Sequence, residues 1–390
     1  MGKRITKILE RVEKSLVTII QEPGADQDVS WPAHVLLAIL KFASLVFTGI
    51  VRMRLLGYRV GLHQRYPLGC QVISVGNITA GGTGKTPVVE KLARELQREG
   101  RKVAILSRGY RKKEAPWWRR KIEPPRVVSD GTRIFLDSEM GGDEPYMLAN
   151  NLPGVAVVVD KNRVKAGRHA VKHFGCDTLV LDDGFQYLKL LHSLEVVLVD
   201  KTNPFGNGNL LPRGVLREPV KNLRRADFIF ITKSDGNSAS LRAQIRALNP
   251  AAEIIECNHA PRHLRDAFTG AELPLDWLNG KKVGALSGIA VPKGFENFLK
   301  KFGATLAFAE RHADHHRYSA REILNAINRA ADLGASALVT TEKDAVRFPR
   351  LQATAVPVLY LRVEIELLTG GIEQVVRRIC DKAPRERAKP

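Results

Sequence analysis

Residues 72 to 87 read VISVGNITAGGTGKTP, and the segment VVEKLARELQREG follows at residues 88 to 100. The first five residues have the apolar, β-branched character of a buried strand, and the last segment has a helical pattern. Between them lies a glycine-rich loop whose backbone N–H groups can converge on phosphate oxygens. Lys85 can reach the terminal phosphates of a nucleotide, and the Thr86 hydroxyl can join the shell of a Mg²⁺ ion. This stretch therefore predicts a phosphate-binding loop between a strand and a helix.

The loop departs from the G-x-x-x-x-G-K-[ST] pattern at one position, because Thr79 stands where the first glycine is expected. Strand, glycine loop and helix nevertheless follow in the order that nucleotide binding requires, and a merely tight turn would not need the lysine. The residues expected to bind the nucleotide are Thr79, Gly81, Gly82, Thr83, Gly84, Lys85 and Thr86.

Two consecutive carboxylates end another apolar strand of the chain. Asp182 and Asp183 follow the residues TLVL and precede Gly184. Carboxylates at the carboxyl end of a parallel strand face the crevice where ligands bind, and there they can hold Mg²⁺ directly or through water. We therefore expect Thr86, Asp182 and Asp183 to form part of a magnesium site.

The rest of the chain alternates strand-like and helical segments. Strand-like runs occur at residues 72–76, 102–108, 155–160, 177–183, 194–200 and 227–233, and a second set occurs at 252–257, 282–290, 336–343 and 356–363. Continuous β-branched runs are typical of a parallel sheet that is covered on both faces. The sequence therefore predicts an α/β, doubly wound P-loop NTPase fold with a second, smaller α/β domain. The expected boundaries are 1–65 for an amphipathic arm and an apolar helix, 66–239 for the nucleotide-binding domain, and 240–390 for the smaller domain.

The apolar helix is predicted from residues 33–51. Of these 19 residues, 14 are Ala, Val, Ile, Leu or Phe, and only Lys41 is charged. A helix of this length extends about 28 Å, close to the hydrocarbon thickness of a bilayer. The segment predicts membrane association, either across the bilayer or in its interface, and Lys41 leaves a buried helix as the alternative. Basic residues follow it closely, which by the positive-inside rule would keep the rest of the chain in the cytoplasm.

The chain carries 61 Lys and Arg against 41 Asp and Glu, a formal net charge of +20. Such an excess favours polyanionic partners, including anionic lipid, nucleic acid and phosphorylated substrates. Residues 108–121 combine seven basic side chains with two tryptophans, a composition that suits contact with membrane headgroups or with single-stranded nucleic acid. The four cysteines have no C-x-x-C spacing, so the sequence indicates neither a disulfide framework nor a familiar zinc site.

Several motifs together resemble one family, the tetraacyldisaccharide 4'-kinases of lipid A synthesis. The resemblance covers residues 30 to 375 and depends on motifs that occur in one order. They are GNITAGGTGKTP at 76–87, SRGY at 107–110, GDEP at 142–145, DKNR at 160–163, LDDGFQ at 181–186, LLPRGVLREP at 210–219, ADHH at 313–316 and TTEKDAVRF at 340–348. Thr79 in place of the first glycine is normal for that family.

The resemblance implies an activity and a set of catalytic residues. Such kinases use ATP to phosphorylate the 4'-hydroxyl of a membrane-embedded acylated disaccharide phosphate. Asp143 would act as general base, paired with His315 from the second domain, so that the pair would form only when a cleft between two Rossmann-like domains closes. His316 remains a competing partner. Arg163 and Arg217 would stabilise charge on the transferring phosphoryl group or hold the phosphate of the substrate. At the metal site, Glu144 would be a second acidic group and Gln186 would position metal-bound water.

The resemblance also implies cofactors, partners and location. ATP and Mg²⁺ are the expected cofactors, and the partners are the lipid substrate and an anionic membrane surface, with no nucleic acid. The expected location is the cytoplasmic face of the inner membrane, where the amino-terminal helix holds the enzyme. The oligomeric state is left open.

Two other functions compete with this interpretation. The sequence Thr232-Lys233-Ser234-Asp235 resembles the element by which GTPases recognise guanine, so a P-loop GTPase or a metallochaperone-type NTPase is the main alternative. Against it, Leu181 occupies the Asp position of a D-x-x-G switch that would end at Gly184. A metal-dependent phosphoesterase is the second alternative, with ligands His312, Asp314, His315 and His316.

Overall fold

The computed structural model describes residues 31–109, 123–351 and 354–381. The predicted amphipathic arm at residues 1–30 and most of the basic stretch at 108–121 lie outside these described residues. Contacts within the chain divide it into two compact units. Unit 1 comprises residues Met1–Leu106, Asn162–Asn258 and Leu367–Pro390, and unit 2 comprises Ser107–Lys161 and His259–Glu366.

A parallel sheet forms the centre of unit 1, in the strand order β8-β7-β6-β1-β5-β2. Its strands are β1 (Gln71–Asn77), β2 (Val103–Ser107), β5 (Thr178–Asp182), β6 (Leu194–Asp200), β7 (Phe228–Thr232) and the first half of β8 (Glu253–Asp266). Every residue of β1, β2, β5 and β7 is buried, which is why these strands read as continuous apolar runs. The predicted doubly wound α/β fold is therefore confirmed in this unit.

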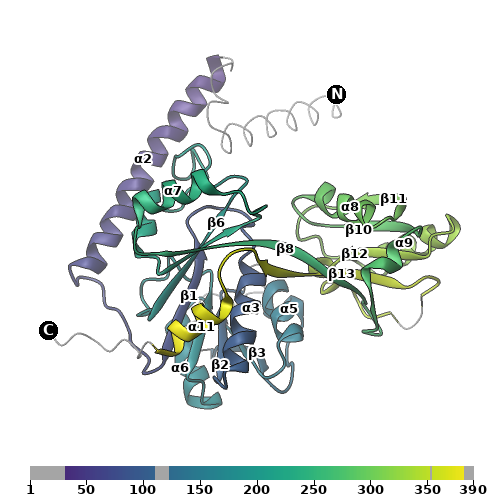
Figure 1. Cartoon of the computed structure of the whole chain (residues 1–390), viewed down its shortest axis with the longest axis horizontal. Coiled ribbons are helices and arrows are strands. Elements are labelled where there is room, and N and C mark those ends of the chain that lie inside the picture. Colours follow the sequence, from purple (N-terminus) through teal and green to yellow (C-terminus); the bar gives the residue numbers. More distant parts are fainter. Residues whose placement is uncertain (1–30, 110–122, 352–353, 382–390) are drawn as a thin grey trace. The chain divides into compact units, whose positions relative to one another are not determined.

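The described helices of unit 1 flank this sheet (Figure 1). They are α2 (Trp31–Arg59), α3 (Lys85–Arg98), α6 (Arg163–Phe174), the 3₁₀ helix η1 (Val220–Arg225), α7 (Ala239–Leu248) and α11 (Ile372–Asp381). Helix α3 buries Val88, Val89, Leu92 and Leu96 against the sheet. Helix α11 contacts α3, and the Gln71 side chain in β1 donates to the carbonyl of Ile379 in α11 at 2.6 Å.

Unit 2 contains a second parallel sheet with the strand order β11-β10-β12-β13. Its strands are β10 (Lys282–Ser287), β11 (Thr305–Arg311), β12 (Ala337–Thr341) and β13 (Val358–Leu367). The end of β8 pairs with β9 (Glu272–Leu273), and β3 (Arg126–Asp130) pairs with β4 (Ala156–Val159), both antiparallel. The helices are α4 (Ser138–Gly141), α5 (Asp143–Asn151), η2 (Leu275–Leu278), α8 (Pro292–Lys301), α9 (Ala320–Asp332) and α10 (Glu342–Ala345).

The division into units differs from the expected boundaries, because residues 107–161 group with 259–366 and not with the strands of unit 1. Polar contacts hold this inserted segment to the carboxyl-terminal part of unit 2. Asn151 at the end of α5 donates to Glu342 of α10 at 2.6 Å, and Arg317 donates to the Ser138 side chain and carbonyl at 3.1 and 3.0 Å. The second α/β unit is therefore assembled from two separate stretches of sequence.

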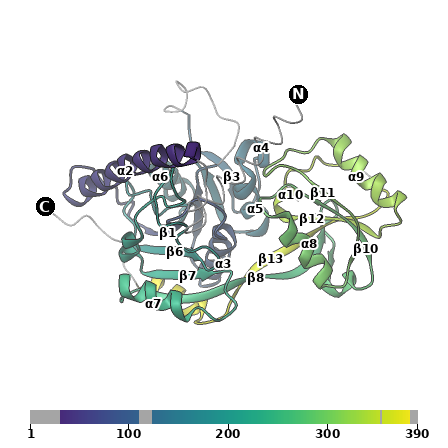
Figure 2. The same ribbon diagram turned by 90° about the horizontal axis from the view of Figure 1, so that it is seen from above.

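Helix α2 is longer than the predicted apolar segment, and it lies as one straight helix on the outside of unit 1 (Figures 1 and 2). By length and composition alone, residues Ala33–Arg59 could cross a membrane. One side of the helix is attached to unit 1. Phe47 and Val51 pack against its core, Ser44 donates to the Leu210 carbonyl at 2.7 Å, and Lys41 donates to Asn209 at 2.5 Å.

The opposite side of α2 is an exposed apolar stripe. Its members recur every three or four residues, which places them on one face of a helix. They are Trp31, Val35, Ile39, Phe42, Val46, Ile50, Met53, Leu56 and Val60, which follows the helix end. Phe42 is 70% exposed, an unusual state for a large aromatic side chain in water. The predicted apolar helix is therefore neither a buried core helix nor free on all sides.

Candidate active site

The phosphate loop of unit 1 joins the end of β1 at Asn77 to the start of α3 at Lys85. Gly81 and Gly84 have φ values of 116° and 79°, which side chains rarely adopt, so the loop depends on glycine at both positions. Within the described part of the chain no side chain caps the N-terminus of α3, and its first N–H groups are left for an anion. The buried Thr83 hydroxyl has no hydrogen-bond partner in the described chain, so it too is left for a ligand.

Lys85 is held at this loop by two groups. Its Nζ lies 3.2 Å from Asn77 Oδ1 and 3.5 Å from an oxygen of Asp183. Thr79 is buried, and Asn77 Nδ2 donates to its carbonyl at 2.7 Å and approaches its hydroxyl at 3.3 Å. The threonine in place of the first glycine therefore makes contacts within the protein that shape the loop. Asn77 is a site residue that the sequence interpretation did not select.

The two predicted carboxylates lie at the carboxyl end of β5, the strand beside β1. Asp182 is the last residue of β5 and is in register with Val75 of β1, and Asp183 follows it. Arg217 Nη1 donates to both oxygens of Asp183 at 2.9 Å. Burial raises the pKa of Asp183, but its ion pairs with Lys85 and Arg217 outweigh that effect and hold the pKa below its usual value. The structure thus brings Lys85, Asp183 and Arg217 together as a charged cluster around an ionised Asp183.

Two further predicted residues lie in unit 1. Gln186 Nε2 donates to the Asn77 carbonyl at 2.9 Å, and its Oε1 is buried without a hydrogen-bond partner among the described residues. Arg163 begins α6, is buried, and lies with its guanidinium 5.1 Å from the centre of the Tyr187 ring. Gln186 therefore offers an acceptor to the site, while the ring fixes the orientation of Arg163.

Asp143 lies in unit 2, at the start of α5, and is 6% exposed. Its Oδ2 lies 3.2 Å from His315 Nδ1 and 3.1 Å from Arg347 Nε, and its Oδ1 accepts from Arg317 at 3.0 Å. Burial raises the pKa of Asp143, but these three partners outweigh it and hold the pKa below its usual value. The carboxylate is therefore ionised and fixed in position.

The Asp143–His315 pair lies within one unit, so the expectation that the two residues belong to different domains and meet only on closure is wrong. His315 and His316 were both candidate partners of Asp143, and the structure shows different contacts for the two side chains. His316 Nε2 contacts Glu322 at 3.0 Å, and its ring stacks on His312 with centroids 4.4 Å apart. His315 alone of the two reaches Asp143.

His315 is held by a strained loop and by a lysine. Its φ is 64°, a conformation that residues other than glycine seldom adopt, and its backbone N–H donates to the Gly288 carbonyl at 3.2 Å. A Cβ at Gly288 would meet the Tyr318 hydroxyl at 2.8 Å, so the loop requires glycine there. Lys343 Nζ lies 3.3 Å from His315 Nε2 and 3.8 Å from Glu144. Glu144 thus contacts the His315 cluster through Lys343.

Arg317, Lys343 and Arg347 surround Asp143 and His315, yet the sequence interpretation did not select them. Arg317 follows the ADHH motif directly, and the other two lie inside TTEKDAVRF, so the signal was present in the motifs. Asp344, which is fully buried, accepts from Arg347, Tyr318 and the Gly288 N–H at 3.1 to 3.2 Å. It therefore fixes both Arg347 and the His315 loop.

The ion pairs of Asp143 predict how unit 2 responds to acid. The pKa of Asp143 is lower in the folded chain than in the unfolded chain, so ionisation of Asp143 stabilises the fold at pH values above the unfolded pKa of about 4. This contribution is lost as the pH falls through the pKa of the folded state. In urea unfolding between pH 3 and pH 6, Asp143→Asn should therefore show a weaker loss of stability on acidification than the parent chain. Asp332→Asn, at an exposed position without ion pairs in the described residues, serves as the control. Parallel curves for the parent and Asp143→Asn would contradict the linkage.

The predicted guanine element lies in unit 1, where its residues serve as internal contacts. Thr232 donates to the Thr83 carbonyl at 2.9 Å, Lys233 pairs with Asp200, and Asp235 pairs with Lys201. The predicted phosphoesterase ligands are not assembled as a set. Among the described residues, the ligand atoms of His312, His316 and Glu322 lie within 4.8 Å of one another, while His315 contacts Asp143.

A glycine loop at the carboxyl end of a parallel strand, with a carboxylate at the end of the neighbouring strand, makes unit 1 a P-loop nucleotide-binding fold. The family model described as Tetraacyldisaccharide-1-P 4'-kinase matches residues 36–381. This chain therefore belongs to the tetraacyldisaccharide 4'-kinase family, and the predicted resemblance is confirmed. The same match decides against the GTPase and phosphoesterase alternatives.

Individual relatives agree with this assignment over most of their length. The tetraacyldisaccharide 4'-kinase of Anaeromyxobacter dehalogenans (strain 2CP-C) is 42% identical over 339 residues, which cover 86% of this chain and 88% of the relative. That of Syntrophus aciditrophicus (strain SB) is 37% identical, covering 89% and 92%. A crystal structure of LpxK from Aquifex aeolicus in complex with ATP is 29% identical, with a TM-score of 0.70, and covers 88% of this chain and 99% of that one.

Proposed function

We propose that this chain is a kinase that transfers the terminal phosphoryl group of ATP to the 4'-hydroxyl of a tetraacyldisaccharide 1-phosphate, a lipid A precursor. Membership of the family supports both the reaction and the substrate class. The observation that carries the proposal is the Asp143–His315 pair, because it supplies a proton acceptor in a chain that also holds a phosphate loop around Lys85. A protein that only bound nucleotide would not need such an acceptor.

In this proposal unit 1 binds the nucleotide. The N–H groups of residues 81–84 and the unpartnered Thr83 hydroxyl take up phosphate oxygens, and Lys85 compensates their charge. Arg217 is held beside the loop by Asp183, where its guanidinium can stabilise charge on the transferring group. Arg163 is oriented by Tyr187 for the same task or for the phosphate of the substrate.

Mg²⁺ is the expected metal, and the residues present fit it. The donors are all oxygens, as Mg²⁺ prefers, and the buried Gln186 Oε1 lacks a partner among the described residues. We infer that Asp182, Asp183, Thr86 and Gln186 hold the ion and its water. Glu144 contacts Lys343 of unit 2, which favours a role near the base over the predicted role as a metal ligand. When bound, the ion neutralises charge on the β- and γ-phosphates.

Unit 2 supplies the base. We infer that Asp143 accepts the proton of the 4'-hydroxyl and that His315 orients the carboxylate through the hydrogen bond that Nδ1 donates to it. Lys343 Nζ can only donate, so His315 Nε2 accepts from it and His315 Nδ1 carries the hydrogen donated to Asp143. A carboxylate with a lowered pKa is a weak base, which suffices where phosphoryl transfer passes through a loose transition state.

A direct assay tests this function. The purified chain, a detergent-dispersed tetraacyldisaccharide 1-phosphate and Mg²⁺ are incubated with ATP labelled in its terminal phosphate. We expect the label to appear in the lipid, at the 4' position, and GTP to be a much poorer donor. Label released only as inorganic phosphate would overturn the proposed kinase function, and equal use of GTP would contradict the expected preference for ATP.

We also propose that α2 holds the enzyme on the membrane surface, at the cytoplasmic face, and does not cross the bilayer. The contacts of Lys41, Ser44 and Phe47 with unit 1 support this, because a helix surrounded by lipid could not make them. The exposed stripe then enters the interface while the attached side stays with the protein.

The stripe predicts the effect of polar substitutions on membrane binding. Ile39→Asn with Phe42→Asn should lower partitioning into lipid vesicles at high salt by at least about 10-fold, since each buried apolar side chain contributes about 1.5–3 kcal/mol. Vesicle sedimentation measures it. Phe135→Asn, at an exposed position of unit 2, is the control and should bind as the parent does. Unchanged partitioning of the double variant would show that the stripe does not meet lipid.

A further inference from the structure

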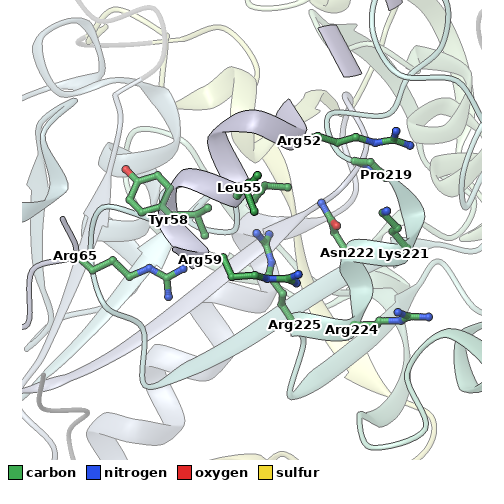
Figure 3. Close-up of a pocket in the computed structure, with 12 residues that line it drawn as sticks. Arg52, Leu55, Tyr58, Arg59, Arg65, Pro219, Lys221, Asn222, Arg224 and Arg225 are labelled. Atoms are coloured by element: carbon green, nitrogen blue, oxygen red, sulfur yellow. The ribbon is translucent and has the colours of Figure 1, made fainter. Parts of the chain in front are cut away.

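A groove of about 770 Å³ opens in unit 1 where α2 ends (Figure 3). Its walls come from the last turns of α2, the loop that follows, and η1. Six of its lining residues are cationic: Arg52, Arg59, Arg65, Lys221, Arg224 and Arg225. In the close-up, the side chains of Arg59 and Arg225 are drawn across the middle of the view, and Arg52, Arg65 and Arg224 are drawn around them.

Almost none of this charge is neutralised within the protein. Across residues 31–109, 123–351 and 354–381, only Arg225 of the six forms an ion pair with a carboxylate, 3.0 Å from Glu218. Nη2 of Arg225 makes that pair and also donates to the Phe185 carbonyl at 3.1 Å, and the guanidinium lies 4.0 Å from the centre of the Phe185 ring. The other five cations have no carboxylate partner in the same residues. Cations that line one groove without carboxylate partners repel one another, so they indicate a ligand with anionic oxygens.

The apolar part of the groove indicates where that ligand comes from. Leu55, Leu56 and Leu188 line it beside the cations, and Leu56 belongs to the exposed stripe of α2. An anionic group in the groove would therefore lie next to the face of the helix that is turned to lipid. Apart from the cations, the polar side chains among the described lining residues are those of Asn222 and Tyr58, and this lining includes no carboxylate that could accept from sugar hydroxyls.

We propose that this groove binds the phosphate headgroup of an anionic phospholipid of the bilayer. Its phosphate oxygens pair with Arg59, Arg225 and Arg224, and its acyl chains continue along Leu56 and the stripe of α2. The proposal depends on the proposed membrane placement of α2 and is independent of the phosphoryl-transfer chemistry. The apolar stripe of α2 binds any lipid, and the groove would add a preference for anionic phospholipids.

The test compares two charge-matched double variants of the full chain. Arg59→Gln with Arg224→Gln removes two cations of the groove, and Arg321→Gln with Arg377→Gln removes two exposed cations elsewhere. Binding is measured by sedimentation with phosphatidylcholine vesicles and with vesicles that contain phosphatidylglycerol in addition. At physiological salt we expect the groove variant to lose about 30-fold in affinity for the anionic vesicles and the control variant to change little. Both should bind phosphatidylcholine as the parent does.

Two control measurements distinguish a lost phosphate contact from a folding defect and from binding of free phosphate. Arg59→Lys with Arg224→Lys retains both charges and should recover most of the binding, which excludes a folding defect as the cause. Soluble glycerol phosphate or inorganic phosphate should compete only weakly, because neither offers acyl chains. Equal losses in the groove and control variants, or full competition by free phosphate, would overturn the proposal.

The kinase assay with detergent-dispersed substrate separates this proposal from the proposed function. A rise in KM for the disaccharide in the groove variant would assign the groove to the phosphate of the substrate and overturn the phospholipid proposal. Absence of any kinase activity in the parent chain would contradict the proposed function instead and would leave the vesicle results standing.

Discussion

Lys85→Ala should lower kcat for phosphoryl transfer by about 10²- to 10³-fold, the range seen when one preorganised electrostatic contact to a transition state is removed. The lysine is the one side chain of the loop that can bring full positive charge to the phosphates. The side chain keeps 15% of its surface exposed and its described partners are Asn77 and Asp183, so truncation costs little packing. Asp183 retains Arg217, and the fold should survive.

The measurement is single-turnover transfer from ATP, with thermal unfolding recorded in parallel. Lys91→Ala is the matched control, because Lys91 lies in the same helix but pairs with Glu95 on its surface. We expect the control to keep the parent rate. A Lys85→Ala variant with kcat within about tenfold of the parent would show that the loop does not hold the reacting phosphates.

Asp143→Asn and His315→Gln should each lower kcat by about 10²-fold or more, which is the usual contribution of positioned acid–base catalysis. Because the two side chains are hydrogen-bonded within one unit, we expect them to act together. The kcat of the double variant should then be only slightly lower than that of the less active single variant. KM for the disaccharide should change little in all three. Rapid-quench kinetics at saturating ATP separates kcat from KM.

His316→Gln is the control for this cycle, since His316 contacts Glu322 and not Asp143. It should keep kcat within a few-fold of the parent. Additive losses for Asp143 and His315, or an effect of His315→Gln on KM alone, would contradict the pair and leave His315 as a binding residue. A comparable loss in His316→Gln would show that the second imidazole takes part.

The sequence predicts best what is encoded in short, contiguous patterns. The phosphate loop, the buried strands and the apolar helix each follow from the order of residues within about twenty positions, and each is present. The tertiary grouping of residues 107–161 is not encoded in this way, because it depends on contacts such as that of Asn151 with Glu342, 191 residues apart. For the same reason the domain boundary at residue 240 did not anticipate that Asp143 and His315 share a unit.

In the candidate site too, the residues that lie in short motifs were predictable and the contacts between distant residues were not. Lys85, Asp183 and Arg217 could be proposed from motifs, and the structure brings them within ion-pair distance. The cationic side chains that hold Asp143 lie in or beside the motifs, but the sequence does not say which of its many arginines and lysines meet that carboxylate in a chain of net charge +20. The groove at the end of α2 was equally hidden, since its cations come from two segments about 160 residues apart and only folding brings them together.

The contact between Gln71 and Ile379 has a consequence for biosynthesis. Gln71 opens the strand that leads to the phosphate loop, and α11, which carries Ile379, packs on the helix that follows the loop. Unit 1 is built from three stretches of chain, the last of which begins at Leu367. A ribosome must therefore synthesise both stretches of unit 2 before the helix that follows the phosphate loop can pack against α11. Premature termination before α11 should yield a chain whose nucleotide site is incompletely supported, however intact its motifs.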